Sequence, residues 1–146
     1  MEILTISPKE TQKTGIIFAK EILKLPLRKR ALVLGLKGDL GGGKTTFLQG
    51  LARGLRIREK ILSPTFILMR KFQIPNSKFQ TFYHIDCYRI EKPKEILDLG
   101  FKEIILNPKN IIAIEWSERV KKILPKETIT LKFNFINKST RKIEIK

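Results

Sequence analysis

One run of the sequence has residue types and spacing suited to holding phosphate groups. Residues 38–45, Gly-Asp-Leu-Gly-Gly-Gly-Lys-Thr, match every fixed position of the phosphate-binding loop (P-loop) pattern G-x-x-x-x-G-K-S/T. Glycines in such a loop let successive backbone N–H groups turn toward one phosphate, and the N-terminus of the next helix adds the positive end of its dipole. Lys44 then reaches the β- and γ-phosphates, and the Thr45 hydroxyl ligates Mg²⁺. The run therefore predicts a site for a nucleoside triphosphate, with Mg²⁺ as its cofactor.

The residues on both sides of this loop supply the elements that it needs. Residues 31–34, Ala-Leu-Val-Leu, form an apolar, β-leaning run that predicts a buried strand. Residues 46–52 carry apolar side chains at helical spacing and predict the following helix. A glycine-rich turn that happens to precede Lys44 is the competing interpretation, and the strand–loop–helix context argues against it. We expect Lys44 to be exposed in the absence of nucleotide. The expected nucleotide contacts of the loop are Asp39, Leu40, Gly41, Gly42, Gly43, Lys44, Thr45 and Thr46.

Two further apolar runs end in a carboxylate. Residues 111–115 read Ile-Ile-Ala-Ile-Glu, and residues 82–86 read Phe-Tyr-His-Ile-Asp. A P-loop needs an acidic partner that holds Mg²⁺ or positions water, and an apolar strand beside the loop commonly carries it at its C-terminal end. Each acid could instead be a surface carboxylate at a strand end. The residues alone leave open whether Glu115, Asp86 or both serve the metal.

Capping and turn residues divide the rest of the chain into elements. Ser7, Pro8 and Glu10 are the residue types expected at the N-cap, first and third positions of a helix, which Pro26 ends. The other expected elements are helices over residues 93–99 and up to residue 124, strands over residues 2–6, 66–69, 79–86 and 110–115, and a final hairpin over residues 128–145. The order predicts an α/β fold: a P-loop NTPase-like mixed sheet with helices on both faces and antiparallel edge strands. We expect a single P-loop ATPase domain over residues 1–146.

Composition limits the class of protein. The 146 residues suffice for one globular domain with its own core, and 42% of them are hydrophobic. Cys87 is the one cysteine, which excludes an intramolecular disulfide and a cysteine-based zinc site. The first ten residues do not resemble a signal segment, and no apolar run approaches the roughly 18 residues of a membrane span. We expect a cytoplasmic protein with no membrane partner.

The net charge of +16 has two interpretations. A strongly basic surface attracts the phosphate backbone of nucleic acid over long range. The basic residues, however, are scattered in short groups, and lysine that solvates the surface of a protein from a compositionally biased proteome gives the same total. Charge alone does not identify the partner.

Four motifs in a fixed order resemble one family. They are residues 38–47 (GDLGGGKTTF), 63–66 (SPTF), 84–89 (HIDCYR) and 114–116 (IEW). Together they resemble the bacterial TsaE family (formerly YjeE), the small ATPase of the tRNA threonylcarbamoyladenosine pathway, and the resemblance covers nearly the whole chain. It implies ATP as substrate nucleotide, Mg²⁺ as cofactor, and the proteins TsaB and TsaD as partners, with tRNA contacted indirectly or transiently.

The resemblance also implies residue roles. Lys44 matches the phosphate-binding lysine and is expected to act in catalysis. Thr45 and Glu115 match the Mg²⁺ ligands, and Asp86 matches an acid needed for hydrolysis, which is expected to position the attacking water. The further positions on the nucleotide side are Thr11 near the adenine, Arg141 near the exposed side of the nucleotide, and Glu118.

Several residues keep two interpretations. Thr65 fits a loop that senses the γ-phosphate, or a plain Ser-Pro turn. Trp116 fits core packing or a functional side chain, and His84 favours a structural role on the strand face that it shares with Asp86. Tyr88 and Arg89 fit contact with a partner or with the phosphates.

The leading hypothesis is an accessory ATPase, weak alone and coupled to partner proteins. Its hydrolysis would drive the complex that forms threonylcarbamoyladenosine next to the anticodon of tRNAs reading codons that begin with adenine. A small-molecule or nucleoside kinase and a nucleotide-gated RNA-binding module are the alternatives. The chain has no evident lid segment or second substrate domain, which argues against the kinase.

Overall fold

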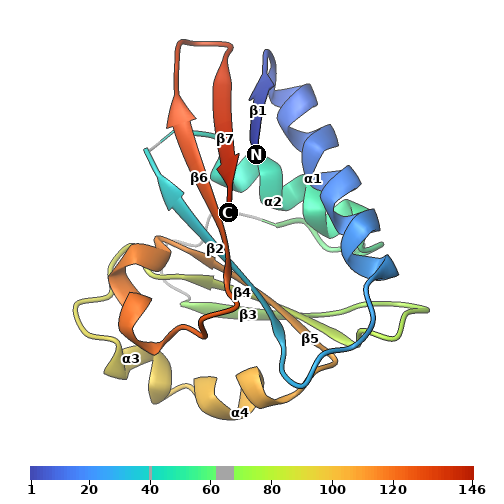
Figure 1. Ribbon diagram of the computed structural model, residues 1–146, viewed down its shortest axis with the longest axis vertical. Coiled ribbons are helices and arrows are strands. Elements are labelled where there is room, and N and C mark those ends of the chain that lie inside the picture. The colour runs from blue at the N-terminus through green and yellow to red at the C-terminus, as the bar shows by residue number, and fades with distance from the viewer. Residues whose placement is uncertain (40, 62–67) are drawn as a thin grey trace.

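A computed structural model describes residues 1–39, 41–61 and 68–146 of the chain. Leu40 of the predicted nucleotide contacts, Thr65 with its SPTF motif, and the first part of the strand expected at 66–69 lie outside these described residues. Figure 1 shows a twisted sheet whose long central strands run diagonally across the view, with helices on either side. The elements in chain order are β1 (Glu2–Thr5), α1 (Pro8–Lys24), β2 (Leu32–Gly38), α2 (Lys44–Gly54), β3 (Met69–Gln73), β4 (Thr81–Asp86), α3 (Lys94–Leu97), α4 (Phe101–Leu106), β5 (Asn110–Glu115), the 3₁₀ helix η1 (Ser117–Ile123), β6 (Ile129–Phe135) and β7 (Arg141–Ile145).

The sheet has seven strands in the order β1-β7-β6-β2-β5-β4-β3. The four central strands, β6, β2, β5 and β4, run parallel to one another. The hairpins β3–β4 and β6–β7 and the pair β1–β7 are antiparallel. The predicted mixed sheet with antiparallel edges is therefore confirmed. Parallel strands end at one edge of a sheet, so the loops that follow β2, β4 and β5 lie together.

Alternation along β2 fills a core on each face of the sheet. Leu32, Leu34 and Leu36 belong to a cluster packed beneath α1 and α2. Val33 belongs to a second cluster with the apolar side chains of α3, α4 and η1. Figure 1 shows the two helix groups on opposite sides of the sheet, as the sequence predicted. A strand buried on both faces reads as an apolar run, which is why residues 31–34 were recognisable.

Helices α1 and α2 pack with their backbones unusually close. A Cβ atom on Gly15 or Gly50 would overlap a backbone carbonyl of the other helix, and one on Gly54 would lie 2.6 Å from the Cβ of Ala19. Small residues permit this approach because nothing projects between the helices. The start of α1 is fixed separately, since Ser7 Oγ accepts a hydrogen bond from the backbone N–H of Glu10 as predicted. Helix α1 is thus held where its first turns meet the P-loop.

One local prediction needs correction. The helix expected over 93–99 is the short α3, and a separate helix, α4, follows it directly. Gly100 between them has φ +86° and is the N-cap of α4. The six-residue apolar segment of α4 is too short to display a clear helical period. Among the described residues, no helix is long and apolar enough to cross a membrane.

Candidate nucleotide-binding site

A cavity of about 410 Å³ opens at the carboxyl ends of the parallel strands, against the start of α2. Strand β2 leads into the loop at Gly38, and α2 begins at Lys44 directly after Gly43. The cavity is lined by Pro8, Thr11, Gly41, Gly43, Lys44, Thr45, Thr46, Asp86, Tyr88, Arg89, Glu115, Trp116, Ser139 and Arg141. This position, outside the carboxyl ends of the strands, is where open α/β sheets bind ligands.

The loop backbone leaves room for a ligand. Gly41 and Gly43 have φ of +76° and +99°, which side chains other than glycine rarely adopt. A Cβ atom on Gly41 would meet nothing within 4 Å, so open space lies beside this part of the loop. The free N–H groups at the start of α2 face the same region, and helix N-termini favour anions. The local geometry suits a phosphate group.

Lys44 is buried, contrary to the expectation that it would be exposed without nucleotide. Only 6% of the residue is exposed, and its Nζ donates hydrogen bonds to the carbonyl oxygens of Gly38 (2.8 Å) and Asp39 (3.2 Å). The same Nζ lies 4.0 Å from the centroid of the Trp116 ring. Burial lowers the pKa of the Lys44 ammonium, while nearby carboxylates, that of Glu115 first, act in the opposite direction. The loop thus folds around its own lysine, whose ammonium is held by two carbonyl oxygens of the loop.

The two candidate acids lie side by side. In the parallel pair β4–β5, Asp86 is in register with Glu115. Glu115 is 4% exposed, and its Oε2 lies 2.7 Å from Nε2 of the buried His84. His84 therefore contacts Glu115 on the neighbouring strand, and it shares a face of β4 with Asp86, two residues further on, as expected. His84 Nδ1 is buried without a hydrogen-bond partner among the described residues.

Asp86 is the more accessible acid. Its Oδ1 accepts a hydrogen bond from the backbone N–H of Tyr88 (2.9 Å). Burial raises the pKa of the Asp86 carboxyl; the bond from Tyr88 opposes this shift, and the carboxylate of Glu115 adds to it. A carboxylate with a raised pKa at the floor of a cleft is a candidate for proton transfer or for orienting water.

Aromatic and cationic groups cover one side of the loop lysine. Trp116 has φ +58°, a strained conformation for a bulky residue, and this turns the chain sharply after β5. Its ring centroid lies 5.1 Å from that of Tyr88, which is 46% exposed. Arg119 lies 5.7 Å from each of the two rings. This conformation was not predictable from the sequence, because a positive φ at tryptophan has no residue-type signature.

On the other side, the start of α1 and the β6–β7 hairpin approach the loop. Arg141 Nε donates a hydrogen bond to the carbonyl oxygen of Gly41 (2.8 Å). Thr11 is 1% exposed, and its hydroxyl pairs with that of Thr5 at 2.6 Å. Pro8 and Ser139 also line the cavity here and were not among the predicted contacts. Only the three-dimensional fold could have revealed them, since neither has a distinctive motif.

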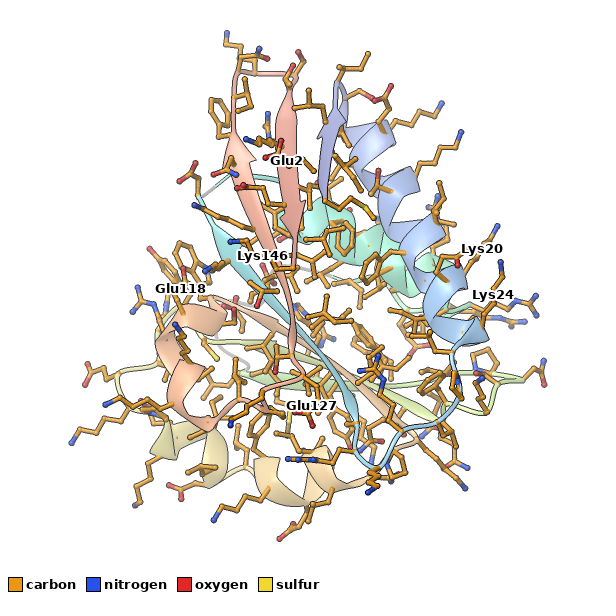
Figure 2. All side chains as sticks on the ribbon, viewed as in Figure 1. Glu2, Lys20, Lys24, Glu118, Glu127 and Lys146 are labelled. Carbon is orange, nitrogen blue, oxygen red and sulfur yellow. The ribbon has the colours of Figure 1, made fainter. Side chains whose placement is uncertain are left out.

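The structure gathers most of the predicted site residues at this cavity. Those that line it are Thr11, Gly41, Gly43, Lys44, Thr45, Thr46, Asp86, Glu115 and Arg141. Three others do not. Gly42 and Asp39 bond to each other through their backbones, and the Asp39 carboxylate accepts the N–H of Phe135. Glu118 is exposed on η1, where Figure 2 labels it, and influences Lys44 through its charge.

The available donors suit Mg²⁺ better than a metal held by protein alone. Thr45 and Glu115 both line the cavity. The part of the chain that the structure describes has no group of three or more histidine, cysteine, aspartate or glutamate side chains placed to hold a metal. Mg²⁺ keeps several waters and commonly binds one or two protein oxygens together with substrate phosphates. The residues present therefore fit Mg²⁺ that arrives with a nucleotide.

A strand, a glycine loop and a helix at the carboxyl edge of a parallel sheet define a P-loop NTPase-like domain. The crystal structure of Bacillus subtilis YdiB superposes with a TM-score of 0.72 and 27% identity, over 98% of this chain and 82% of that one. A family profile described as "Threonylcarbamoyl adenosine biosynthesis protein TsaE" matches residues 5–143. The chain belongs to the TsaE family.

Sequence relatives support the same assignment. A protein of Treponema pallidum is 32% identical over 99% of each chain. One of Rickettsia typhi is 37% identical over 96% of this chain and 90% of its own length. One of Bacillus subtilis is 35% identical over 87% of this chain and 73% of its own length. Each is named "tRNA threonylcarbamoyladenosine biosynthesis protein TsaE". The chain is thus similar to biosynthesis proteins of this tRNA modification across nearly its full length.

Proposed function

We propose that this protein is an accessory ATPase that binds and hydrolyses Mg-ATP to drive the complex forming threonylcarbamoyladenosine next to the anticodon of tRNAs that read codons beginning with adenine. The observation that carries the ATPase proposal is the convergence of Lys44, Thr45, Asp86 and Glu115 on one cavity. The pathway comes from the names of the relatives.

Nucleotide binding would begin with an exchange of partners at Lys44. Its ammonium now bonds to the carbonyl oxygens of Gly38 and Asp39. Phosphate oxygens carry negative charge and form stronger hydrogen bonds with an ammonium than carbonyl oxygens do. The β- and γ-phosphates would therefore attract Lys44 from the loop carbonyls, while the N–H groups at the start of α2 hold the phosphates from the other side.

Thr45 and Glu115 would hold Mg²⁺, which neutralises phosphate charge when it is bound. The bond from His84 to Oε2 fixes the orientation of the Glu115 carboxylate. Such supporting hydrogen bonds commonly control how well a ligand oxygen is presented to a metal. Glu115 thus acts as a fixed, buried carboxylate whose place in the fold does not depend on the nucleotide.

Asp86 would orient the attacking water. It lies beside Glu115 in register but keeps more solvent contact. The N–H of Tyr88 holds one of its oxygens. A carboxylate in this position accepts a hydrogen bond from water and aims it at the γ-phosphate, which contributes to the transition state more than to ATP binding.

Partner proteins would complete the site. The cavity is open, and the exposed Tyr88 lies on its rim. Open phosphate sites commonly gain activity when another protein supplies the missing groups and excludes water. We propose TsaB and TsaD as these partners, with tRNA engaged through the complex.

The decisive experiment measures ATP hydrolysis by the purified chain, alone and with TsaB, TsaD, tRNA and a donor of the threonylcarbamoyl group. We expect slow hydrolysis alone, stimulation by the complete set, and threonylcarbamoyladenosine in the tRNA detected by mass analysis of nucleosides. The matched control is Lys44→Ala in the same mixture. Fast hydrolysis that ignores TsaB and TsaD would contradict coupling to them, and transfer of the labelled γ-phosphate to a metabolite would favour a kinase.

A further inference from the structure

The tip of the β6–β7 hairpin carries an exposed phenylalanine next to the P-loop. Phe135 is 46% exposed and stands opposite Arg141 in the β6–β7 register. The guanidinium carbon of Arg141 lies 4.6 Å from the centroid of the Phe135 ring. An arginine this close to a ring is attracted by the electron-rich face of the ring. Phe135 is therefore a contact of Arg141 and not simply an unburied apolar side chain.

The same arginine is bonded to the loop. Its Nε donates to Gly41 O at 2.8 Å, and its Nη1 donates to Asn137 O (2.6 Å) and Thr140 O (3.1 Å). The guanidinium is planar, and its five N–H donors form a rigid fork. A ring that fixes this plane consequently fixes the direction in which Nε points. Phe135 and the hairpin carbonyls together aim Arg141 at Gly41.

The peptide that joins Gly41 to Gly42 is held at both ends. Arg141 binds its carbonyl oxygen, and its N–H, that of Gly42, donates to Asp39 O at 3.0 Å. Because a peptide unit is planar, fixing the carbonyl also fixes the N–H. The carboxylate of Asp39 in turn accepts the N–H of Phe135 at 3.3 Å. A closed chain of contacts thus runs from Phe135 through Arg141, Gly41, Gly42 and Asp39 back to Phe135.

We propose that Phe135 is a positioning residue for the P-loop. It acts through Arg141, and its ring keeps the Gly41–Gly42 peptide in one orientation at the edge of the cavity that Gly41 lines. Glycines at positive φ have many alternative conformations, so an outside constraint reduces the entropy lost when phosphate binds. The nucleotide part of this inference rests on the proposed ATP binding. Phe135 would thus influence nucleotide affinity from outside the cavity.

The test compares three variants. Phe135→Leu keeps an apolar side chain and removes the ring, Phe135→Tyr keeps the ring, and Ile136→Ala is the matched control. Ile136 is 51% exposed on the same hairpin end and bonds to Thr140 through its backbone N–H. The dissociation constant for a slowly hydrolysed ATP analogue is measured by calorimetry. We expect binding weaker by about two- to fivefold in Phe135→Leu, the size of an exposed cation–π contact, and wild-type binding in the other two.

A second measurement uses the protein without nucleotide. The backbone amide resonances of Gly41, Gly42 and Gly43 should shift or broaden in Phe135→Leu and stay in place in Phe135→Tyr and Ile136→Ala. Thermal unfolding checks that all three variants are folded. Unchanged glycine resonances and unchanged affinity in Phe135→Leu would overturn the proposal.

The outcomes separate this inference from its alternatives. If Phe135→Leu and Ile136→Ala both reduce stimulation by partner proteins while affinity and glycine resonances stay as in the wild type, the hairpin end is a partner contact and the proposal is wrong. If the wild type does not bind the analogue, the proposed ATPase function fails. The glycine resonances then still decide whether Phe135 positions the loop.

Discussion

The two walls of the cavity are built from different chemistry. The wall formed by β4 and β5 presents ionisable groups, with the half-buried Asp86 in register with the buried Glu115 and His84 bonded to Glu115. The opposite wall, formed by α1 and the β6–β7 hairpin, is held by hydrogen bonds to hydroxyl and carbonyl oxygens, as for Thr11 and Arg141. The wall of β4 and β5 places ionisable side chains where phosphate chemistry would occur. The wall of α1 and the hairpin holds the conformation of the loop.

This contrast predicts a division of labour. Changes on the strand wall should alter turnover and Mg²⁺ dependence. Changes on the helix and hairpin wall should alter nucleotide affinity with a smaller effect on the chemical step. Lys44 lies at the end of the loop, between the two walls, so its loss should affect both nucleotide affinity and turnover.

Lys44→Ala should have the largest effect. The variant loses the charge that would hold the β- and γ-phosphates and stabilise the transition state, so we expect no measurable ATP hydrolysis and strongly weakened ATP binding. Calorimetry measures ATP binding, and a phosphate-release assay measures hydrolysis. Because Lys44 is buried against Trp116, Lys44→Met is the control that keeps the apolar stem. Hydrolysis at the wild-type rate in either variant would contradict the proposed site.

Asp86→Asn should lower turnover by about a hundredfold or more while ATP affinity changes little, as expected of a group that acts on the attacking water. Single-turnover hydrolysis and binding of an ATP analogue separate the two effects. An equal loss of affinity would instead assign Asp86 to binding.

The pH dependence of activity and of stability tests the same residue. Burial raises the pKa of Asp86, so activity should fall on acidification at a pH above the range of an ordinary aspartate. The folded chain then binds a proton more tightly than the unfolded chain, and stability is lost as pH rises through the raised pKa. Asp86→Asn removes this cost, and its thermal midpoint at neutral pH should be no lower than that of the wild type.

Glu115→Gln should act through Mg²⁺. The amide keeps the size of the side chain but loses the anionic oxygen, and we expect the Mg²⁺ concentration for half-maximal activity to rise roughly ten- to a hundredfold. The measurement is a Mg²⁺ titration at saturating ATP. An unchanged midpoint of the Mg²⁺ titration together with lost turnover would place Glu115 in the chemical step instead.

Gly50→Ala should have the smallest effect on turnover and a clear effect on stability. Its Cβ would overlap the carbonyl of Gln12, so α1 must shift, at a cost of about 1–3 kcal/mol in the free energy of unfolding. Denaturant unfolding measures this cost. Lys20→Ala on the outer side of α1 is the control, since Figure 2 shows Lys20 extending away from the sheet. Stability equal to that of the wild type would mean that the two helices are not packed as closely as described.

The fold could be predicted where local patterns were strong. The strands at 31–34 and 110–115 follow from continuous apolar runs, and the final hairpin follows from period-two alternation around turn residues; the structure contains all three. Helix α4 was missed because its few residues show no clear period. The strand expected at 66–69 lies partly beyond the described residues, and the polar Arg70 and Lys71 of β3 give little strand signal.

The candidate site was predictable as a set of residue types but not as an arrangement. The loop motif indicated which atoms would meet phosphate, whereas the pairing of His84 with Glu115 depends on the register of two strands separated by α3 and α4. The burial of Lys44 depends on where the loop backbone places its carbonyl oxygens, and residue types do not determine that. The bond from Arg141 to Gly41 joins positions 100 residues apart, and only the assembled sheet brings them together.

The position of Trp116 also gives the molecule a built-in optical probe. It is the single tryptophan of the chain, and its ring lies 4.0 Å from the ammonium of Lys44. Indole emission responds to nearby charge and to contact with solvent. A displacement of Lys44 toward a phosphate would therefore change the fluorescence of the unmodified protein, and the occupancy of the loop could be followed in real time without a label.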